Sequence, residues 1–185
     1  MVSQYYLEHR ASILQKLASE REERRKNRLN KIREIVLSKT ETAYIAGFVD
    51  GEGYIGCYPR KDTKDRLQRP CLAIVNTDLD VLVWIKSVTK LGFITKPRMR
   101  KSSYKPCYEY RITNMTDIGS ICKTLLPYLK VKKEKALLVI EYIYQRLSRV
   151  NTVEKDKAGR FIRVLGKPNS QHEKEILQAL KRKSP

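Results

Sequence analysis

Two acidic residues stand two positions apart inside the glycine-rich stretch IAGFVDGEG, which spans Ile45–Gly53. The residues before it read as a helix that reaches about Asp50, so Glu52 leaves the C-terminal end of that helix. A carboxylate in this place meets the negative end of the helix dipole, which is unfavourable unless a cation lies beside it. The spacing therefore predicts a divalent cation at Glu52, whereas Asp50 is expected to satisfy backbone groups near the helix end.

The rest of the chain is strongly basic. Its 185 residues include 39 Lys and Arg against 20 Asp and Glu, a formal net charge of +19. A positive electrostatic field of this strength indicates a polyanionic partner. Nucleic acid is the first candidate and an acidic membrane surface is the second. Only the segment 41–52 is acidic, so its carboxylates stand out from their surroundings.

The composition also limits the compartment and the metal chemistry. The four cysteines show neither the CxxC nor the Cys/His spacing of a zinc site, and they are expected to be buried free thiols. The N-terminus lacks the apolar region of a signal peptide, and no apolar run approaches the length of a membrane span. We therefore expect an intracellular protein without a membrane partner.

The pattern of apolar and turn residues predicts an α+β fold. A helix is expected over 5–38, and a second one, capped by Thr40 or Thr42, leads into the acidic stretch. Two strands, a helix, two further strands and two helices follow. Their expected ranges are 53–60, 69–76, 77–92, 93–101, 107–113, 116–126 and 133–147, and a basic link leads to a last helix at 170–183.

This order contains two similar αββ units, which implies a four-stranded antiparallel sheet with helices on one face. The other face is free to meet a partner, and a two-stranded ribbon fits the major groove of duplex DNA. Basic and aromatic strand residues would make that face suitable for DNA. The candidates are Tyr58, Arg60, Arg69, Lys96, Arg98 and Arg111.

The acidic stretch resembles the LAGLIDADG motif, which it matches at Ala46, Gly47, Asp50 and Gly53. The segment PYLKVKKEKALLVIEYI, at 127–143, looks like the part of single-motif homing endonucleases that carries an active-site lysine. The resemblance covers roughly residues 40–147. It implies the αββαββα fold with a saddle-shaped sheet over residues 40–150, a basic helical extension at 1–39, and a basic C-terminal extension at 151–185 that contains a helix.

The resemblance also implies an activity and a site. Members of this family hydrolyse phosphodiester bonds of double-stranded DNA with Mg²⁺ or another divalent cation. The correspondence places metal binding at Glu52 and the carbonyl of Gly51, and catalytic roles at Glu52, Lys132 and Asn76. Asn76 stands where the family often has Gln, and Asp80 lies near a place where some members carry a basic residue, so the chain departs from the family pattern at both positions.

The single copy of the motif implies a homodimer that recognises a long pseudo-palindromic target. Gly47 lies four positions before Gly51, so both occupy one helical face and let two helices approach closely. The expected dimer interface consists of Ala46, Gly47, Val49 and Asp50. The intron-encoded members of the family provide the model for this arrangement.

Other functions fit the same residues. An RNA-binding maturase that assists intron splicing shares the fold and the basic surface, and so does a non-catalytic DNA-binding regulator. Retention of Glu52 favours cleavage, because neither alternative requires this acid. The N-terminal helix could extend the DNA contacts, pack over the core or mediate assembly.

Overall fold

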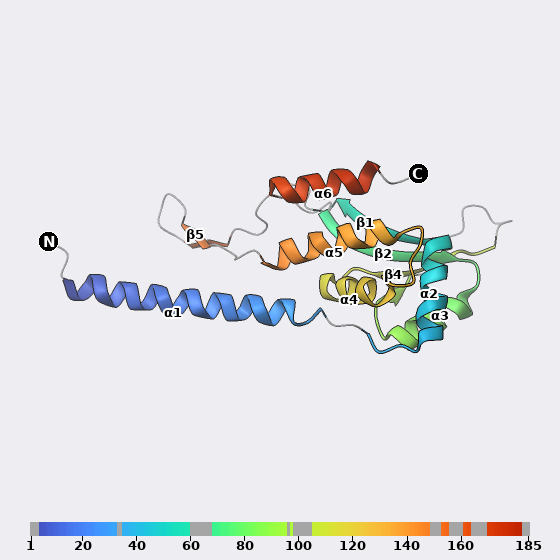
Figure 1. The fold of residues 1–185 in the computed structure, drawn as a ribbon, viewed down its shortest axis with the longest axis horizontal. Coiled ribbons are helices and arrows are strands. Elements are labelled where there is room, and N and C mark those ends of the chain that lie inside the picture. Colours follow the sequence, from blue (N-terminus) through green and yellow to red (C-terminus); the bar gives the residue numbers. More distant parts are fainter. Residues whose placement is uncertain are drawn as a thin grey trace.

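The computed structural model describes residues 4–32, 35–59, 68–95, 97, 105–148, 153–155, 161–163 and 170–182. Within these ranges the helices and strands form an α+β fold (Figure 1). In chain order the elements are α1 (Gln4–Leu29), α2 (Lys39–Glu52), β1 (Gly53–Pro59), β2 (Gln68–Asn76), α3 (Leu79–Thr89), β3 (Phe93–Ile94), β4 (Tyr108–Ile112), α4 (Met115–Leu125), α5 (Lys133–Ser148), β5 (Val153–Lys155), β6 (Phe161–Arg163) and α6 (Gln171–Arg182).

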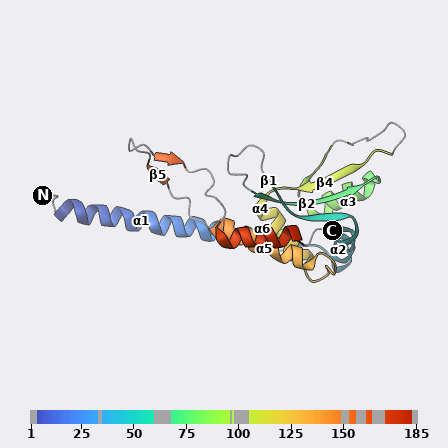
Figure 2. The ribbon, with the colours of Figure 1, turned by 90° about the horizontal axis from the view of Figure 1, so that it is seen from above.

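The predicted four-stranded antiparallel sheet is present, in the order β1-β2-β4-β3. In the central strands, residues that face the helices alternate with residues that face the other way, of which Cys71, Ala73 and Glu109 are also buried. Leu72, Ile74, Tyr110 and Ile112 point into the core and are at most 1% exposed. The residues between them, among them Arg111, point to the opposite face, which Figure 2 shows away from α4, α5 and α6.

The helices form the second layer. The core cluster joins apolar residues of α2, α3, α4, α5 and α6 to the covered face of the sheet. Two polar contacts tie the layers together: the Tyr110 hydroxyl lies 3.0 Å from the Thr89 hydroxyl, and the Tyr142 hydroxyl donates to the Gln68 carbonyl at 2.9 Å. The sheet is therefore held firmly on one side and presents its other face outward.

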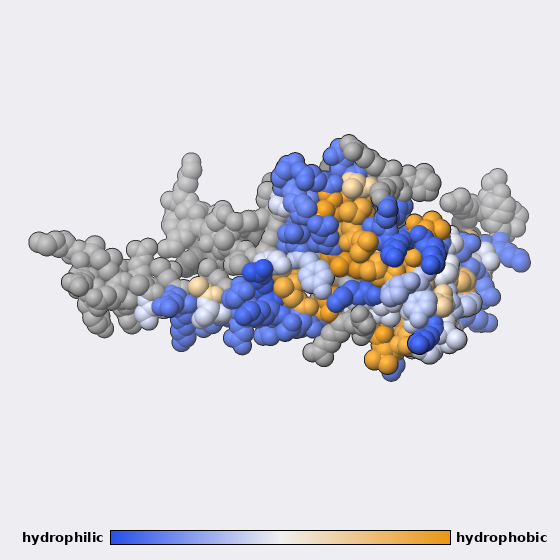
Figure 3. Space-filling model, in the orientation of Figure 1, coloured by the Kyte–Doolittle hydropathy of each residue, from blue (hydrophilic) through white to orange (hydrophobic). Residues whose placement is uncertain are grey.

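Both extensions are helical, but the N-terminal one is shorter than predicted. Helix α1 ends at Leu29, not at residue 38, because the chain turns to bury Ile32 against Gly119 of α4. The Ile35 amide then donates to the Thr124 hydroxyl at 2.8 Å. Helix α1 projects away from the core, and its described surface is mostly hydrophilic, whereas apolar residues gather around α5 (Figure 3).

Three further details differ from the sequence-based expectations. Helix α2 is capped by Ser38 in place of Thr40 or Thr42, because Ser38 and Glu41 form a reciprocal capping box. Helix α3, expected over 77–92, is capped by Asp78 and spans Leu79–Thr89. The C-terminal link contains a short antiparallel pair of strands, β5 and β6. The sequence did not predict them, because the link contains Gly and Pro.

The C-terminal helix belongs to the core. Its residues Glu173, Ile176, Leu177 and Leu180 are buried against the rest of the molecule. Figures 1 and 2 place α6 along α5 and beside the edge strand β1. None of the helices in the described ranges has both the length and the hydropathy that crossing a membrane requires.

Candidate active site at the end of helix α2

Helix α2 passes directly into β1, and this junction fixes where Glu52 is displayed. The Gly53 amide donates to the Val49 carbonyl, and the backbone of Gly53 is already extended. A Cβ atom on Gly53 would lie 2.6 Å from the Val49 carbonyl oxygen, so only glycine permits so abrupt a change of direction. As a result, Glu52 is the last helical residue and stands at the edge of the sheet.

Asp50 holds the loop that follows α4. Its Oδ2 accepts the amides of Lys130 at 2.7 Å and Val131 at 3.2 Å, and its Oδ1 accepts the amide of Lys132 at 2.8 Å. The Lys132 Nζ in turn donates to the Asp50 carbonyl. Asp50 therefore has the backbone-satisfying role that we expected, and it brings the lysine to the end of α2.

These contacts also change the titration of Asp50. Partial burial favours the protonated acid, but the three amide hydrogen bonds and the Lys132 charge outweigh it, so the pKa is lowered from 3.8. A lowered carboxyl pKa means that ionised Asp50 stabilises the fold above pH 3.8. This contribution is lost as the pH falls below 3.8 through the folded-state pKa.

We predict that Asp50→Asn lowers the free energy of unfolding by about 1–3 kcal/mol, because an amide NH₂ would face a backbone donor. Urea unfolding at pH 7 measures the change. Asp80→Asn is the matched control, since Asp80 is exposed in the first turn of α3 and its loss should cost under about 1 kcal/mol. Equal effects of the two variants would show that the loop contacts contribute nothing.

Glu52 differs from Asp50 in having no partner. It is exposed, and within the described part of the chain its carboxylate makes no hydrogen bond or ion pair. The described residues also contain no group of three His, Cys, Asp or Glu side chains that could hold a metal ion. One chain thus offers the Glu52 carboxylate and the Gly51 carbonyl, a donor set that fits a hard cation but needs further oxygen ligands.

Asn76 lies at the neighbouring strand end. Gly53, the first residue of β1, pairs with Ile74, so Asn76 at the end of β2 lies two residues beyond that pair, at the end of the sheet where α2 ends. The Asn76 Oδ1 accepts the Asp78 amide at 2.8 Å, which fixes the orientation of the side-chain amide. The structure thus brings the predicted site residues Glu52, Lys132 and Asn76 to one end of the sheet. Asp80, in the next helix, is exposed.

The predicted dimer residues fall on different faces of α2. Ala46 and Val49 are 0% exposed and belong to this chain's own core, so their side chains are not available to a second chain. Gly47 and Gly51 are exposed, and a Cβ atom on either would meet nothing within 4 Å. Of the motif residues on α2, the two glycines thus lie on the exposed face. The apolar spacing of Ile45, Ala46 and Val49 was the sequence signal for the buried face.

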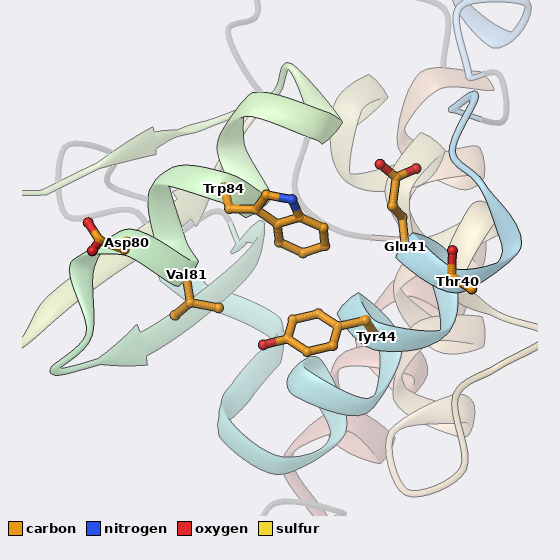
Figure 4. A pocket seen from close by; sticks show the side chains of 6 residues that line it. All are labelled: Thr40, Glu41, Tyr44, Asp80, Val81 and Trp84. Atoms are coloured by element: carbon orange, nitrogen blue, oxygen red, sulfur yellow. The ribbon is translucent and has the colours of Figure 1, made fainter.

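An apolar groove of about 580 Å³ lies between α2 and α3 (Figure 4). The Tyr44 ring from α2 meets the Trp84 ring from α3 edge-on, with centroids 5.2 Å apart. Tyr44 also stacks on Phe48 and remains 51% exposed. The remaining residues that line the groove are Thr40, Glu41, Asp80 and Val81.

The candidate DNA-binding residues are only partly described. Tyr58 and Arg69 pair across β1 and β2 and are half-buried. Arg60, Lys96 and Arg98 lie outside the described residues. Arg111 is described and is bound by Glu109, two residues earlier on β4, which the sequence reasoning missed. The alternation in YEYRIT was the available signal, since it puts both side chains on one face.

The helix order, the antiparallel sheet and the motif helix ending at the sheet edge define the LAGLIDADG homing endonuclease fold. The meganuclease I-SmaMI, solved bound to uncleaveable DNA, superposes with a TM-score of 0.53 at 19% identity, covering 78% of this chain and 44% of that one. The homing endonuclease I-CvuI, in complex with its target, superposes with a TM-score of 0.49 at 22% sequence identity. The match covers 78% of this chain and 94% of that one. The LAGLIDADG homing endonuclease I-GzeII, in complex with its DNA target, superposes with a TM-score of 0.49 at 23% sequence identity. The match covers 58% of this chain and 36% of that one. No protein-family model and no curated protein matches the sequence.

Proposed function

We propose that this protein is a site-specific endonuclease that hydrolyses double-stranded DNA with Mg²⁺ and acts as a homodimer inside the cell. The observation that carries the proposal is the state of Glu52. On a basic chain, the Glu52 carboxylate lies at the end of a helix and beside Lys132, and it has no partner in the described structure. Neither packing nor a salt bridge explains why an acid stands at position 52, whereas a cation bound beside a DNA phosphate would explain it.

The residues around Glu52 have complementary tasks. Glu52 and the Gly51 carbonyl would hold the divalent cation, which when bound neutralises charge on the phosphate group that is attacked. Lys132 places its positive charge beside the same helix end, where it stabilises negative charge that develops in the transition state. Asn76, with its oxygen fixed by Asp78, offers its amide group to orient water.

The outer face of the sheet would bind the duplex. Tyr58, Arg69 and Arg111 are the described residues assigned to this contact, and Arg60, Lys96 and Arg98 are retained as candidates. The fold supports this assignment, because I-SmaMI, which shares it, was solved bound to DNA. The net charge of +19 supplies sequence-independent attraction to the phosphates.

We infer the homodimer because one chain alone supplies too few ligands for the cation and leaves the glycines of α2 exposed. Among the described residues, one chain contributes one free carboxylate at the site, and nothing packs within 4 Å of a Cβ atom placed on Gly47 or Gly51 of α2. Joining two such faces would bring two Glu52 residues together near one twofold axis. Each sheet would then read one half of a pseudo-palindromic target.

Selection of cleaved duplexes from a random library tests the proposal directly. Purified protein with Mg²⁺ is expected to enrich a long pseudo-palindromic sequence, and EDTA should abolish the enrichment. Binding without cleavage would favour the DNA-binding regulator. Binding to intron RNA with no duplex preference would favour the maturase.

A further inference from the structure

Among the described residues, the outer sheet face carries one acidic side chain beside its basic candidates. Glu109 lies on β4 and its side chain is 11% exposed, so it is largely withdrawn from water. It stands between the strands β2 and β3, level with Val75 on β2. An acid in this place repels a DNA phosphate, so its presence on a duplex-binding face calls for a specific use.

The carboxylate is used to hold Arg111. Its Oε1 accepts the Arg111 Nε at 3.0 Å and the Arg111 Nη2 at 2.5 Å. This hydrogen bonding is the main reason why the pKa of Arg111 is raised, so the guanidinium stays charged. An arginine side chain on an open sheet face otherwise has many rotamers, and the ion pair selects one of them.

The geometry leaves the other side of the guanidinium for a ligand. Arginine has five N–H donors in a planar fork, and the contacts with Glu109 use the Nε and Nη2 edge. The edge formed by Nη1 and Nη2 is the one that donates in parallel to the O6 and N7 acceptors of guanine in the major groove. Arg111 pairs with Ala73 on β2 and with Phe93 on β3, and within the described residues its guanidinium makes no hydrogen bond other than those with Glu109.

We propose that Glu109 is a positioning residue that presents Arg111 as a fixed reader of one guanine in each half-site. The proposal rests on the proposed function, because it requires duplex DNA on the outer sheet face. It also places the guanine. Arg111 is level with Tyr54 and Ala73, one pair from the start of β1 at Gly53, whereas Arg69 pairs with Tyr58 towards the far end of that strand. The guanine read by Arg111 therefore lies nearer to the cleavage site than any base read by Arg69.

The test measures which base is preferred at each position. Duplexes bound by the full chain are selected from a random library in Ca²⁺, as a probe of binding without relying on cleavage, and are then sequenced. The wild type is expected to prefer guanine at one symmetric pair of inner positions, by roughly 5- to 150-fold over other bases. Arg111→Ala should remove this preference and leave the other positions unchanged, while Arg69→Ala should keep it.

Glu109→Gln separates positioning from simple support of the fold. Loss of the charge frees the arginine, so the guanine preference should fall at least severalfold while total duplex affinity stays equal or rises. A variant with an unchanged base profile and a lowered melting temperature would show a merely structural pair and overturn the proposal. Guanine preference that survives Arg111→Ala would overturn it too, without touching the proposed endonuclease. If the wild-type protein selects no duplex at all, the proposed function and this inference both fall.

Discussion

Glu52→Gln is expected to abolish DNA cleavage while leaving DNA binding intact. The rate of cleavage of the selected target should fall on the order of 10³-fold or more, because the amide keeps the length of the side chain but loses the charge that would hold the proposed cation. Dissociation constants measured in Ca²⁺ should change only a few-fold. Folding should also be unaffected, since Glu52 is exposed and has no partner in the described structure.

The matched control is Glu23→Gln. Glu23 is exposed on α1, and its replacement changes the net charge of the protein by the same amount. It should cleave at the rate of the unmodified protein. Cleavage by Glu52→Gln at that rate would refute the assignment of Glu52 to the metal, and loss of binding in parallel with cleavage would indicate a structural role instead.

Gly47→Leu should convert the proposed homodimer into a monomer. The glycine faces open space in the single chain, so a leucine fits there without strain and, by replacing a helix-interior glycine, should stabilise the monomer by up to about 1 kcal/mol. In a pair of closely approaching helices the same side chain from each subunit would force the backbones apart. We expect the dimer dissociation constant to rise roughly 100-fold or more, with loss of cleavage.

Sedimentation equilibrium with and without target duplex measures this change, and a thermal melt confirms that the variant is folded. Gln178→Leu is the control, because it adds the same exposed leucine to helix α6, on another part of the surface. A Gly47→Leu protein that remains dimeric would show that α2 is not the contact. A wild-type protein that binds its target as a monomer would exclude the homodimer altogether.

The order of helices and strands could be read from the sequence because it depends on local patterns. Apolar residues recur with the period of a helix or a strand, and glycine at position 53 marks where the helix must end. This local information was enough to place Glu52 at a helix terminus. It was not enough to end α1 at Leu29, because that end depends on Ile32 packing against Gly119, far away in the chain.

The candidate site was also predictable from the sequence only in part. The residues of the motif determined that an acid and two glycines occur together at the end of a helix, since residue identity and spacing suffice for that. Only the tertiary structure decided which face of α2 is free, that Asp50 binds amides of a loop 80 residues later, and that Glu109 holds Arg111. The physical reason is that burial and hydrogen bonding between distant segments depend on how the layers pack, which no local period encodes.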